Sequence, residues 1–522
     1  MKQPARRART VSVAWRAVMA ALALSALGMA GSVAVAGAAS PPVVTFSKGP
    51  VGAPLPAGFV GLSFEFSAVP TYAGSAAAVN PAVVQLIRNL APGQAPILRI
   101  GGDSTDQTWW PVRGVAAPGV VKYALTPAWL QTTGVFARAL GARLILGINL
   151  AINNPALAAA EGKAMVAGIG RRSIAAFEIG NEPDVYRIFP EYRNARGTIE
   201  HVRGQGYDFT AFIKQFSAVR RALPRVPIAG PALGGVGWAS KLGQFIASEP
   251  GLALLTLHLY PLTCSAPAGS SFYPSIGDLL SSDATTALAE SAAPAAVLAR
   301  ASRLSFRVDE LNSVTCGGKL GVSNTFASAL WALDTAFALD QDGVDGINIH
   351  MFPGARYALF SVAGAPGSYS ATVNPEYYGL LMFAEAAPPG SRLVPVSSAP
   401  RGPVKVWATL ARGRTVRVVL INESSATRAL ALRAPSGAAG TATVELLQAP
   451  ALDAATGVVL GGQSFGPSTA TGVLPGPPAT TTVSPSSGKY SVTLPPASAA
   501  MLTWVPASHG GGAGLAGSVT NR

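Results

Sequence analysis

The sequence predicts an α/β protein: a (β/α)8 barrel of the TIM-barrel type followed by a C-terminal antiparallel β-sandwich domain. Apolar runs of strand length alternate eight times with helical patterns through the middle of the chain. After about Ala387, short strand-like runs follow one another instead, separated by Gly, Pro, Ser and Thr. Of the 522 residues, 49% are hydrophobic and 12% charged, which excludes intrinsic disorder over most of the length.

The N-terminal 38 residues resemble an export signal. Met1–Arg16 is basic, Ala17–Ala36 is almost wholly apolar and small, and Ala34–Ala36 and Ala36–Ala38 both fit the small-residue cleavage pattern. We therefore expect residues 1–38 to be a signal peptide and the protein to be secreted and extracellular. The apolar run is also long enough to act as a membrane anchor if it is not cleaved, and no later stretch resembles a membrane span.

The charge balance is mildly basic. The formal net charge is +14, but five of the basic residues lie in the first forty residues, which hold no acid, so the rest of the chain carries +9. No basic run is interleaved with aromatic residues, and a nucleic-acid partner is therefore not expected. The oligomeric state stays open.

Eight predicted strands are apolar throughout, as is typical of parallel strands that are buried on both faces. They are Gly58–Phe66, Pro96–Gly102, Arg143–Asn149, Ile174–Glu182, Pro227–Leu233, Leu252–Tyr260, Leu304–Leu311 and Gly343–Met351. Helical patterns include Asn80–Leu90, Thr126–Leu140, Tyr207–Leu223, Asn324–Leu339 and Asn374–Ala386. We assign residues 58–386 to the barrel. A doubly wound open sheet is the alternative, and the lack of a Gly-rich phosphate turn makes it the weaker one.

The C-terminal domain is expected over residues 387–507. Its strand candidates are Val404–Leu410, Val416–Asn422, Thr441–Gln448 and Tyr490–Leu494. Within the N-terminal segment 39–57, Pro42–Lys48 can add a further strand to this domain. Residues 508–522 are Gly-rich and are expected to form a disordered tail.

Polar residues mark the carboxyl ends of the predicted barrel strands, where the catalytic groups of such barrels lie. They are Glu65, Asp103, Asn181, Glu182, His258, Tyr260, Glu310, Asn312 and His350. Glu182 and Glu310 end strands four and seven, which face each other across the barrel mouth. Two carboxyl groups about 5 Å apart can cleave a glycosidic bond with retention, one as nucleophile and the other as acid/base. The alternative for each is a buried structural glutamate.

Several segments, in this order along the chain, resemble glycoside hydrolase family 79, the β-glucuronidase and heparanase family of the retaining (β/α)8-barrel glycosidase clan. They are Leu98–Asp106 (LRIGGDSTD), Phe177–Asp184 (FEIGNEPD), Asp309–Ser313 (DELNS) with Cys316–Gly318, and Tyr377–Leu380 (YYGL). The resemblance runs from about Gly58 to Ala386. The family also carries a C-terminal β domain, which agrees with the change of composition after Ala387.

The resemblance implies a role for several residues. Glu182 would be the acid/base and Glu310 the nucleophile, and Asn181 would bind the sugar 2-hydroxyl. Glu65 and Asp103 would bind hydroxyls of the cleaved sugar. Many relatives have Asn or Thr where this chain has Asp103, and an ionised carboxylate cannot donate a hydrogen bond, so a loop-capping role is the alternative for Asp103.

Aromatic and basic residues near the strand ends are further candidates. Tyr260 would support the nucleophile through its hydroxyl, whereas for His258 and His350 structural packing is the preferred interpretation. The resemblance points to Tyr378 for the sugar carboxylate, with packing on the β domain as its alternative. Arg356 and Tyr357 are candidates by position. No His/Cys spacing suggests zinc, and no cofactor is expected.

The two cysteines are expected to form a disulfide. Cys264 and Cys316 are the only pair, and export favours their oxidation. They follow predicted strands six and seven, which are neighbours in a barrel. Two buried free thiols are the alternative.

The sequence thus predicts a secreted retaining glycoside hydrolase that acts on β-glucuronides, with carbohydrate as its partner. Two alternatives stay open: another retaining exo-glycosidase, acting on β-glucosides or arabinofuranosides, and a non-catalytic carbohydrate-binding protein.

Overall fold

The computed structural model describes residues 41–194, 196–400 and 402–505. The predicted signal peptide and the predicted tail lie outside the described residues. Among the helices of the described part, none has the length and apolarity needed to cross a membrane.

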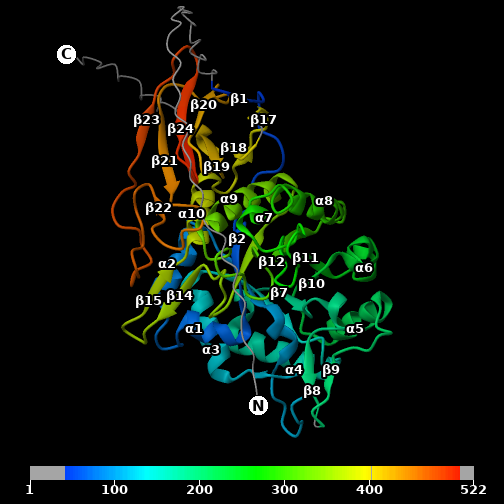
Figure 1. The fold of residues 1–522 in the computed structure, drawn as a ribbon. Coiled ribbons are helices and arrows are strands. Elements are labelled where there is room, and N and C mark those ends of the chain that lie inside the picture. Colours follow the sequence, from blue (N-terminus) through cyan, green and yellow to red (C-terminus); the bar gives the residue numbers. More distant parts are fainter. Residues whose placement is uncertain (1–40, 195, 401, 506–522) are drawn as a thin grey trace, which may run out of the picture. The chain divides into compact units, whose positions relative to one another are not determined.

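The barrel prediction is confirmed by eight parallel strands that form a closed sheet (Figure 1). Each strand pairs with the next along the chain, and the last pairs with the first, with Ile347 opposite Val60. The strands are β2 (Val60–Glu65), β3 (Ile97–Gly101), β6 (Arg143–Ile148), β7 (Ile174–Ile179), β10 (Ile228–Leu233), β11 (Leu252–Leu259), β12 (Ser305–Leu311) and β13 (Ile347–Met351). Because all their carboxyl ends meet at one mouth, residues far apart in the sequence are brought together there.

Helices follow the strands as expected. Two helices begin at N-capping side chains: Asn80 accepts from the backbone N–H of Ala82 and Val83, and Thr126 accepts from that of Trp129. The helices are α1 (Val69–Ala73), α2 (Pro81–Leu90), α3 (Pro127–Leu140), α4 (Pro155–Met165), α5 (Phe209–Ala222), α6 (Leu242–Ser248), α7 (Ile276–Leu279), α8 (Thr286–Ala301), α9 (Phe326–Gln341) and α10 (Pro375–Ala386). Short strand pairs decorate the loops: β4 (Thr108–Trp109) with β5 (Tyr123–Ala124), β8 (Glu191–Arg193) with β9 (Ile199–His201), and β14 (Phe360–Ala363) with β15 (Ser370–Val373).

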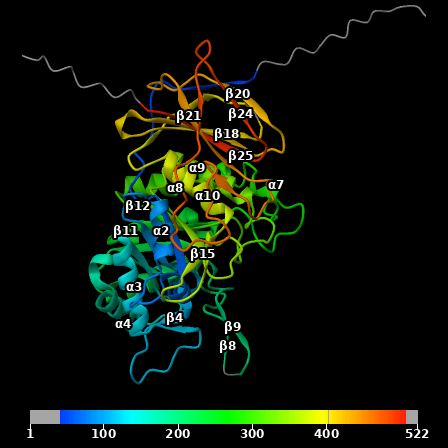
Figure 2. The ribbon, with the colours of Figure 1, turned by 90° about the vertical axis from the view of Figure 1, so that its left-hand side faces the viewer.

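The C-terminal domain consists of two sheets, whose strands can be followed in Figure 2. One contains β17 (Val396–Ser398), β1 (Val43–Phe46), β20 (Arg428–Leu432) and β24 (Tyr490–Leu494). The other contains β16 (Arg392–Leu393), β18 (Val404–Leu410), β19 (Val416–Asn422), β25 (Ser498–Trp504), β21 (Ala442–Gln448) and β22 (Val459–Leu460), with β23 (Thr481–Val483) on β21. All pairs are antiparallel except β1 with β20. A buried cluster that includes Leu420, Leu432 and Trp504 draws on both sheets.

The β domain is attached to the barrel through helix α9. The indole of Trp407 in β18 stacks on Phe337, with ring centroids 5.4 Å apart, and donates a 2.7 Å hydrogen bond to Asp334. The backbone of Ala454 accepts a hydrogen bond from the N–H of Phe326 at the start of the helix. Every residue of α9 from Phe326 to Leu339 is buried, with helices α8 and α10 packed against it and the β domain contributing to the cover.

Candidate active site

Arg99 is the central cation of the barrel mouth. It lies in the otherwise apolar strand β3, and its guanidinium is fully buried. Its Nε donates to Glu178 and its Nη1 to Glu310, each at 2.6 Å. Its Nη2 donates to the amide oxygen of Asn181 at 2.8 Å. One side chain from β3 therefore binds groups on or just after β7 and on β12.

Glu182 and Glu310 face each other with His258 between them. One oxygen of each carboxylate and one nitrogen of His258 all lie within 4.8 Å of one another. Arg99 Nη2 lies 3.1 Å from His258 Nε2, and because a guanidinium only donates, Nε2 must accept. The ring proton therefore sits on Nδ1, which donates to Glu182 Oε1 at 2.9 Å. His258 is buried, as the structural interpretation expects, but both of its ring nitrogens, and not one polar atom alone, bind site groups.

Glu310 lies in an environment that favours its ionised form. Burial alone would raise the pKa of Glu310, but the positive charges of His350 and Arg99 hold it well below its ordinary value. The hydroxyl of Tyr260 donates a 2.9 Å hydrogen bond to Glu310 Oε1, which is the contact predicted for Tyr260 from the sequence. The pKa of Tyr260 is itself raised, by burial and by the nearby Glu310 carboxylate, so its proton is retained.

Glu65 and His350 form a second ion pair at the mouth. Glu65 accepts hydrogen bonds from the backbone N–H of Asp103 at 3.2 Å and of Ser104 at 2.8 Å. His350 Nε2 lies 3.3 Å from Glu65 Oε1. Burial disfavours the charged imidazole, but the carboxylates of Glu310 and Glu65 raise the pKa of His350 above its ordinary value. His350 packs on the rings of Phe352 and Tyr357, as expected, and in addition pairs with Glu65.

Asp103 is positioned by its backbone and not by its side chain. The residue is exposed, and among the described residues none donates a hydrogen bond to its carboxyl group. Although the residue as a whole is exposed, its carboxyl group is crowded by the mouth, and this crowding together with the carboxylates of Glu65 and Glu182 raises the pKa of Asp103 well above its ordinary value. A carboxyl group in this environment takes up a proton readily and can then donate a hydrogen bond.

Asn181 is held on both sides. Its N–H donates to Asp106 Oδ2 at 2.9 Å, while its side-chain oxygen binds Arg99. Asp106 also accepts from the hydroxyl of Tyr186 at 2.6 Å and from the N–H groups of Leu150 and Ala151. The amide nitrogen of Asn181 has no acceptor among the described residues, so it is free to bind a hydroxyl.

The backbone around Glu182 is tightly constrained. Glu182 adopts a left-handed conformation, with φ 51° and ψ 52°, which is uncommon for a non-glycine residue and is often found at functional sites. Gly234, after β10, lies against it: a Cβ at position 234 would stand 2.2 Å from Glu182 Cδ. Asp184 accepts from the N–H groups of Gly234 and Gly235, and burial and Glu182 raise the pKa of Asp184 to about 6.

The predicted disulfide is confirmed. Cys264 and Cys316 are bonded, with their Cα atoms 6.1 Å apart, and they link the loops after β11 and β12. The bond therefore connects the segment following Tyr260 to the segment following Glu310.

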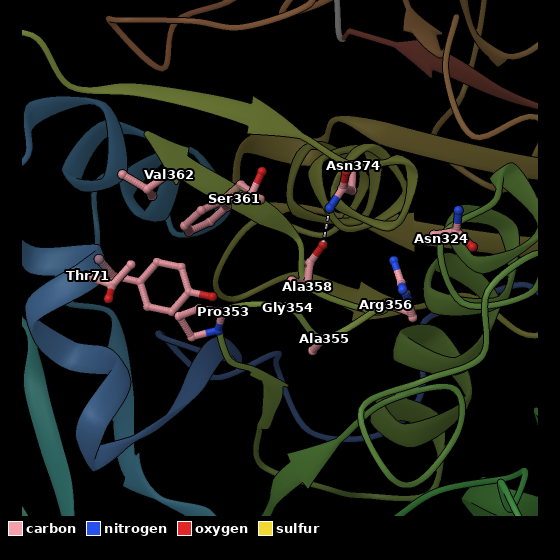
Figure 3. A pocket seen from close by; sticks show the side chains of 12 residues that line it. Thr71, Asn324, Pro353, Gly354, Ala355, Arg356, Ala358, Ser361, Val362 and Asn374 are labelled. Carbon is pink, nitrogen blue, oxygen red and sulfur yellow. Dashed lines mark hydrogen bonds between the residues drawn. The ribbon is translucent and has the colours of Figure 1, made fainter. Parts of the chain in front are cut away.

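Arg356 and Tyr357 face different spaces although they are adjacent. Tyr357 is buried, with its ring centroid 6.4 Å from that of Tyr260. Arg356 lines a separate pocket of about 430 Å³, shown in Figure 3 with Asn324 beside it and Thr71 on the opposite side.

Tyr378 is not brought to this cluster, which corrects the prediction that it binds substrate. Its ring packs on Phe465, with centroids 5.6 Å apart, and its hydroxyl oxygen accepts a hydrogen bond from the Phe465 N–H. Helix α10 is buried on nearly all its faces, so residue 378 contacts the β domain and not the barrel mouth.

Four residues of the site escaped the sequence reasoning: Arg99, Asp106, Glu178 and Asp309. All four are charged residue types and are at most 1% exposed. For Arg99, Glu178 and Asp309 the available signal was a charged residue inside an apolar strand, because such a group is costly unless it is paired.

Comparisons with known proteins bear on the fold and on the C-terminal domain. Residues 406–501 match the model of the glycosyl hydrolase family 79 C-terminal beta domain. A β-glucuronidase from Neurospora crassa is 24% identical over 423 residues, covering 70% of this chain and 72% of that protein. A β-glucuronidase from Aspergillus niger is 25% identical over 460 residues, covering 78% and 82%.

Two solved structures share the fold. A 4-O-α-L-rhamnosyl-β-D-glucuronidase from Fusarium oxysporum aligns with TM-score 0.70 and 21% identity, over 88% of this chain and 100% of the other. A family 51 arabinofuranosidase from Xanthomonas axonopodis pv. citri aligns with TM-score 0.62 and 16% identity, over 88% and 99%. The matched C-terminal domain and the two relatives agree with the resemblance to glycoside hydrolase family 79, and the solved structures agree with the barrel fold.

Proposed function

We propose that the protein is a secreted retaining glycosidase that releases glucuronic acid from β-glucuronides, with Glu310 as nucleophile and Glu182 as acid/base. The observation that carries the proposal is the closeness of the two carboxylates, with one oxygen of each within 4.8 Å of the other. Retaining enzymes place these groups about 5–5.5 Å apart, whereas inverting enzymes need about 6.5–9.5 Å to admit a water molecule.

In the first step Glu310 attacks the anomeric carbon and the leaving oxygen takes a proton from Glu182. Arg99 and Tyr260 each hold one oxygen of Glu310 and so aim the carboxylate. Its lowered pKa keeps Glu310 ionised, as a nucleophile must be. The product is a glycosyl ester on Glu310, and the aglycone departs as a neutral alcohol.

In the second step Glu182, now ionised, takes a proton from a water molecule that attacks the same carbon. The bond from carbon to Glu310 breaks, and glucuronic acid leaves with retained configuration. The Nδ1 proton of His258 is directed at Glu182 Oε1 and stabilises this ionised form.

The remaining groups bind the sugar. The free amide nitrogen of Asn181 donates to an oxygen at the 2-position, a contact that strengthens as charge develops on the ring. Glu65 accepts from a sugar hydroxyl, and Asp103 in its neutral form donates to one. His350 adds a positive charge beside an anionic sugar, which supports a uronate over a neutral substrate.

One assay tests the proposal. Aryl β-D-glucuronide and aryl β-D-glucoside are offered to the wild type and to the Glu182→Gln and Glu310→Gln variants. We expect glucuronide hydrolysis that falls at least about 10³-fold in Glu310→Gln. Equal rates in all three proteins contradict the catalytic roles. Preference for the glucoside contradicts the uronate assignment alone.

Secretion has its own test. We expect the protein isolated from the culture medium to begin after residue 36 or 38, as N-terminal sequencing would report.

A further inference from the structure

A second pocket is lined by residues that contact the two candidate catalytic glutamates. It has a volume of about 420 Å³, and its lining includes Gly234 after β10, Tyr260 after β11, and Ala287 of α8. Gly234 lies in contact with the Glu182 carboxyl group, since a Cβ there would stand 2.2 Å from Cδ. Tyr260 binds Glu310 through its hydroxyl. Two residues that line the pocket, Gly234 and Tyr260, therefore contact Glu182 and Glu310 respectively.

The lining of this pocket is mainly apolar. Leu233, Leu257, Leu259, Pro261 and Leu288 contribute to it, together with Phe272. Phe272 is 58% exposed and is one of few large apolar side chains left open to solvent in the described part of the chain. The polar residues Asp283 and Ser291 are exposed. An aromatic surface that covers Phe272 would remove apolar area from water.

The chemistry of the proposed reaction gives this pocket a use. Glu182 protonates the oxygen of the leaving group, so the atoms beyond that oxygen lie on the Glu182 side of the site. Gly234 forms the wall on that side. A hydroxyl-rich sugar placed among leucines would lose hydrogen bonds to water without replacement, whereas an aryl group would not.

We propose that this pocket is the aglycone subsite and that it takes an aryl group, so the preferred substrates are β-glucuronides of aromatic alcohols. The inference rests on the proposed function of Glu182 and Glu310. It assigns to Phe272 and Leu288 the role of contacting the aglycone.

The test uses S-linked β-D-glucuronides as competitive inhibitors, because a thioglycoside resists cleavage and leaving-group chemistry does not enter the measurement. Inhibition constants are measured for the methyl, phenyl and 2-naphthyl compounds, with a cleavable aryl glucuronide as reporter. We expect the constant to fall at least about tenfold from methyl to 2-naphthyl in the wild type. Equal constants, or tighter binding of an S-linked disaccharide, would overturn the aryl subsite.

Two variants of the same helix locate the effect. Ala287→Trp fills the pocket, and we expect it to lower the methyl-to-naphthyl ratio of inhibition constants about tenfold. Val297→Trp adds the same side chain to α8 at a position that is 68% exposed and not part of the pocket lining, so the ratio should stay as in the wild type. An unchanged ratio in Ala287→Trp places the aryl group elsewhere and contradicts the proposal. A wild type that cleaves no β-glucuronide instead contradicts the proposed function.

Discussion

The guanidinium of Arg99 holds the carboxylate of Glu310 at 2.6 Å in a barrel mouth where both side chains are buried. Glu178 and Asp309 share the same cation, at 2.6 and 3.3 Å. One positive charge does not balance three carboxylates in a desolvated space. Burial and the neighbouring Glu178 raise the pKa of Asp309 well above its ordinary value, while the positive charge of Arg99 holds the pKa of Glu178 below its own.

Replacing Arg99 should separate these groups. Arg99→Lys offers one charged nitrogen where three now bind, so Glu310 or Glu178 loses its partner. We expect kcat/KM to fall at least about 100-fold and the free energy of unfolding to fall by about 3 kcal/mol. Aryl glucuronide kinetics and urea unfolding measure the two effects. Arg143→Lys, at the exposed start of β6, is the control; an Arg99→Lys protein as active as this control would refute the assignment.

The contact of Gly234 with Glu182 predicts a sharp positional effect. In Gly234→Ala the added methyl group must push the Glu182 carboxyl group aside. We expect kcat to fall about tenfold or more with an unchanged melting temperature, because a small displacement of a reacting group is costly. Gly237→Ala in the same loop adds a methyl group with nothing within 4 Å and should behave as the wild type. Equal activity of the two variants would contradict the contact.

Two tyrosines form a matched pair. Tyr260→Phe removes the hydrogen bond to Glu310, and we expect kcat to fall about tenfold with little loss of stability. Tyr378→Phe removes the hydrogen bond from the Phe465 N–H, which should cost about 1 kcal/mol of unfolding free energy without affecting catalysis. Loss of activity in Tyr378→Phe would restore that residue to the site.

The disulfide should contribute to stability by restricting the unfolded chain. Cys264 and Cys316 are 52 residues apart, and the double substitution to Ser should lower the free energy of unfolding by about 2–4 kcal/mol. Guanidinium unfolding with and without dithiothreitol checks this. The reductant should destabilise only the wild type, and a wild type that ignores it would count against the bond.

Glu376 predicts a pH dependence of stability. It is 1% exposed in α10, both carboxylate oxygens lack hydrogen-bond partners among the described residues, and burial raises its pKa well above 4.5. Its contribution to stability is complete below about pH 4.5 and is lost as the pH rises towards the folded-state pKa, by about 1.4 kcal/mol per unit.

Glu376→Gln cannot ionise and should remove this dependence. We expect the variant to gain stability over the wild type as the pH rises from 4.5 to 8, measured by denaturant unfolding at each pH. Glu290→Gln, at an exposed position of α8, should leave the pH profile as it is. Parallel wild-type and Glu376→Gln curves would show that the carboxyl group finds a partner.

The strands that carry the site were predictable from the sequence, but the contacts between its side chains were not. Continuous apolar runs located all eight barrel strands, and strand ends located Glu182 and Glu310. The pairing of Arg99 with Glu310 spans 211 residues and two strands that are not neighbours, and periodicity carries no information about such contacts. Tyr378 was misjudged for a related reason: a helix that is buried on nearly every side has no polar face from which its orientation can be read.

Helix α9 has no solvent-exposed face between Phe326 and Leu339, because every residue in that stretch is buried. Trp407 of the β domain forms part of the cover. A barrel truncated near residue 387 would expose the apolar surface of α9 that the β domain covers, and it would tend to aggregate. The barrel therefore depends on the β domain to cover one of its helices, and a variant that keeps the barrel alone needs polar substitutions on α9.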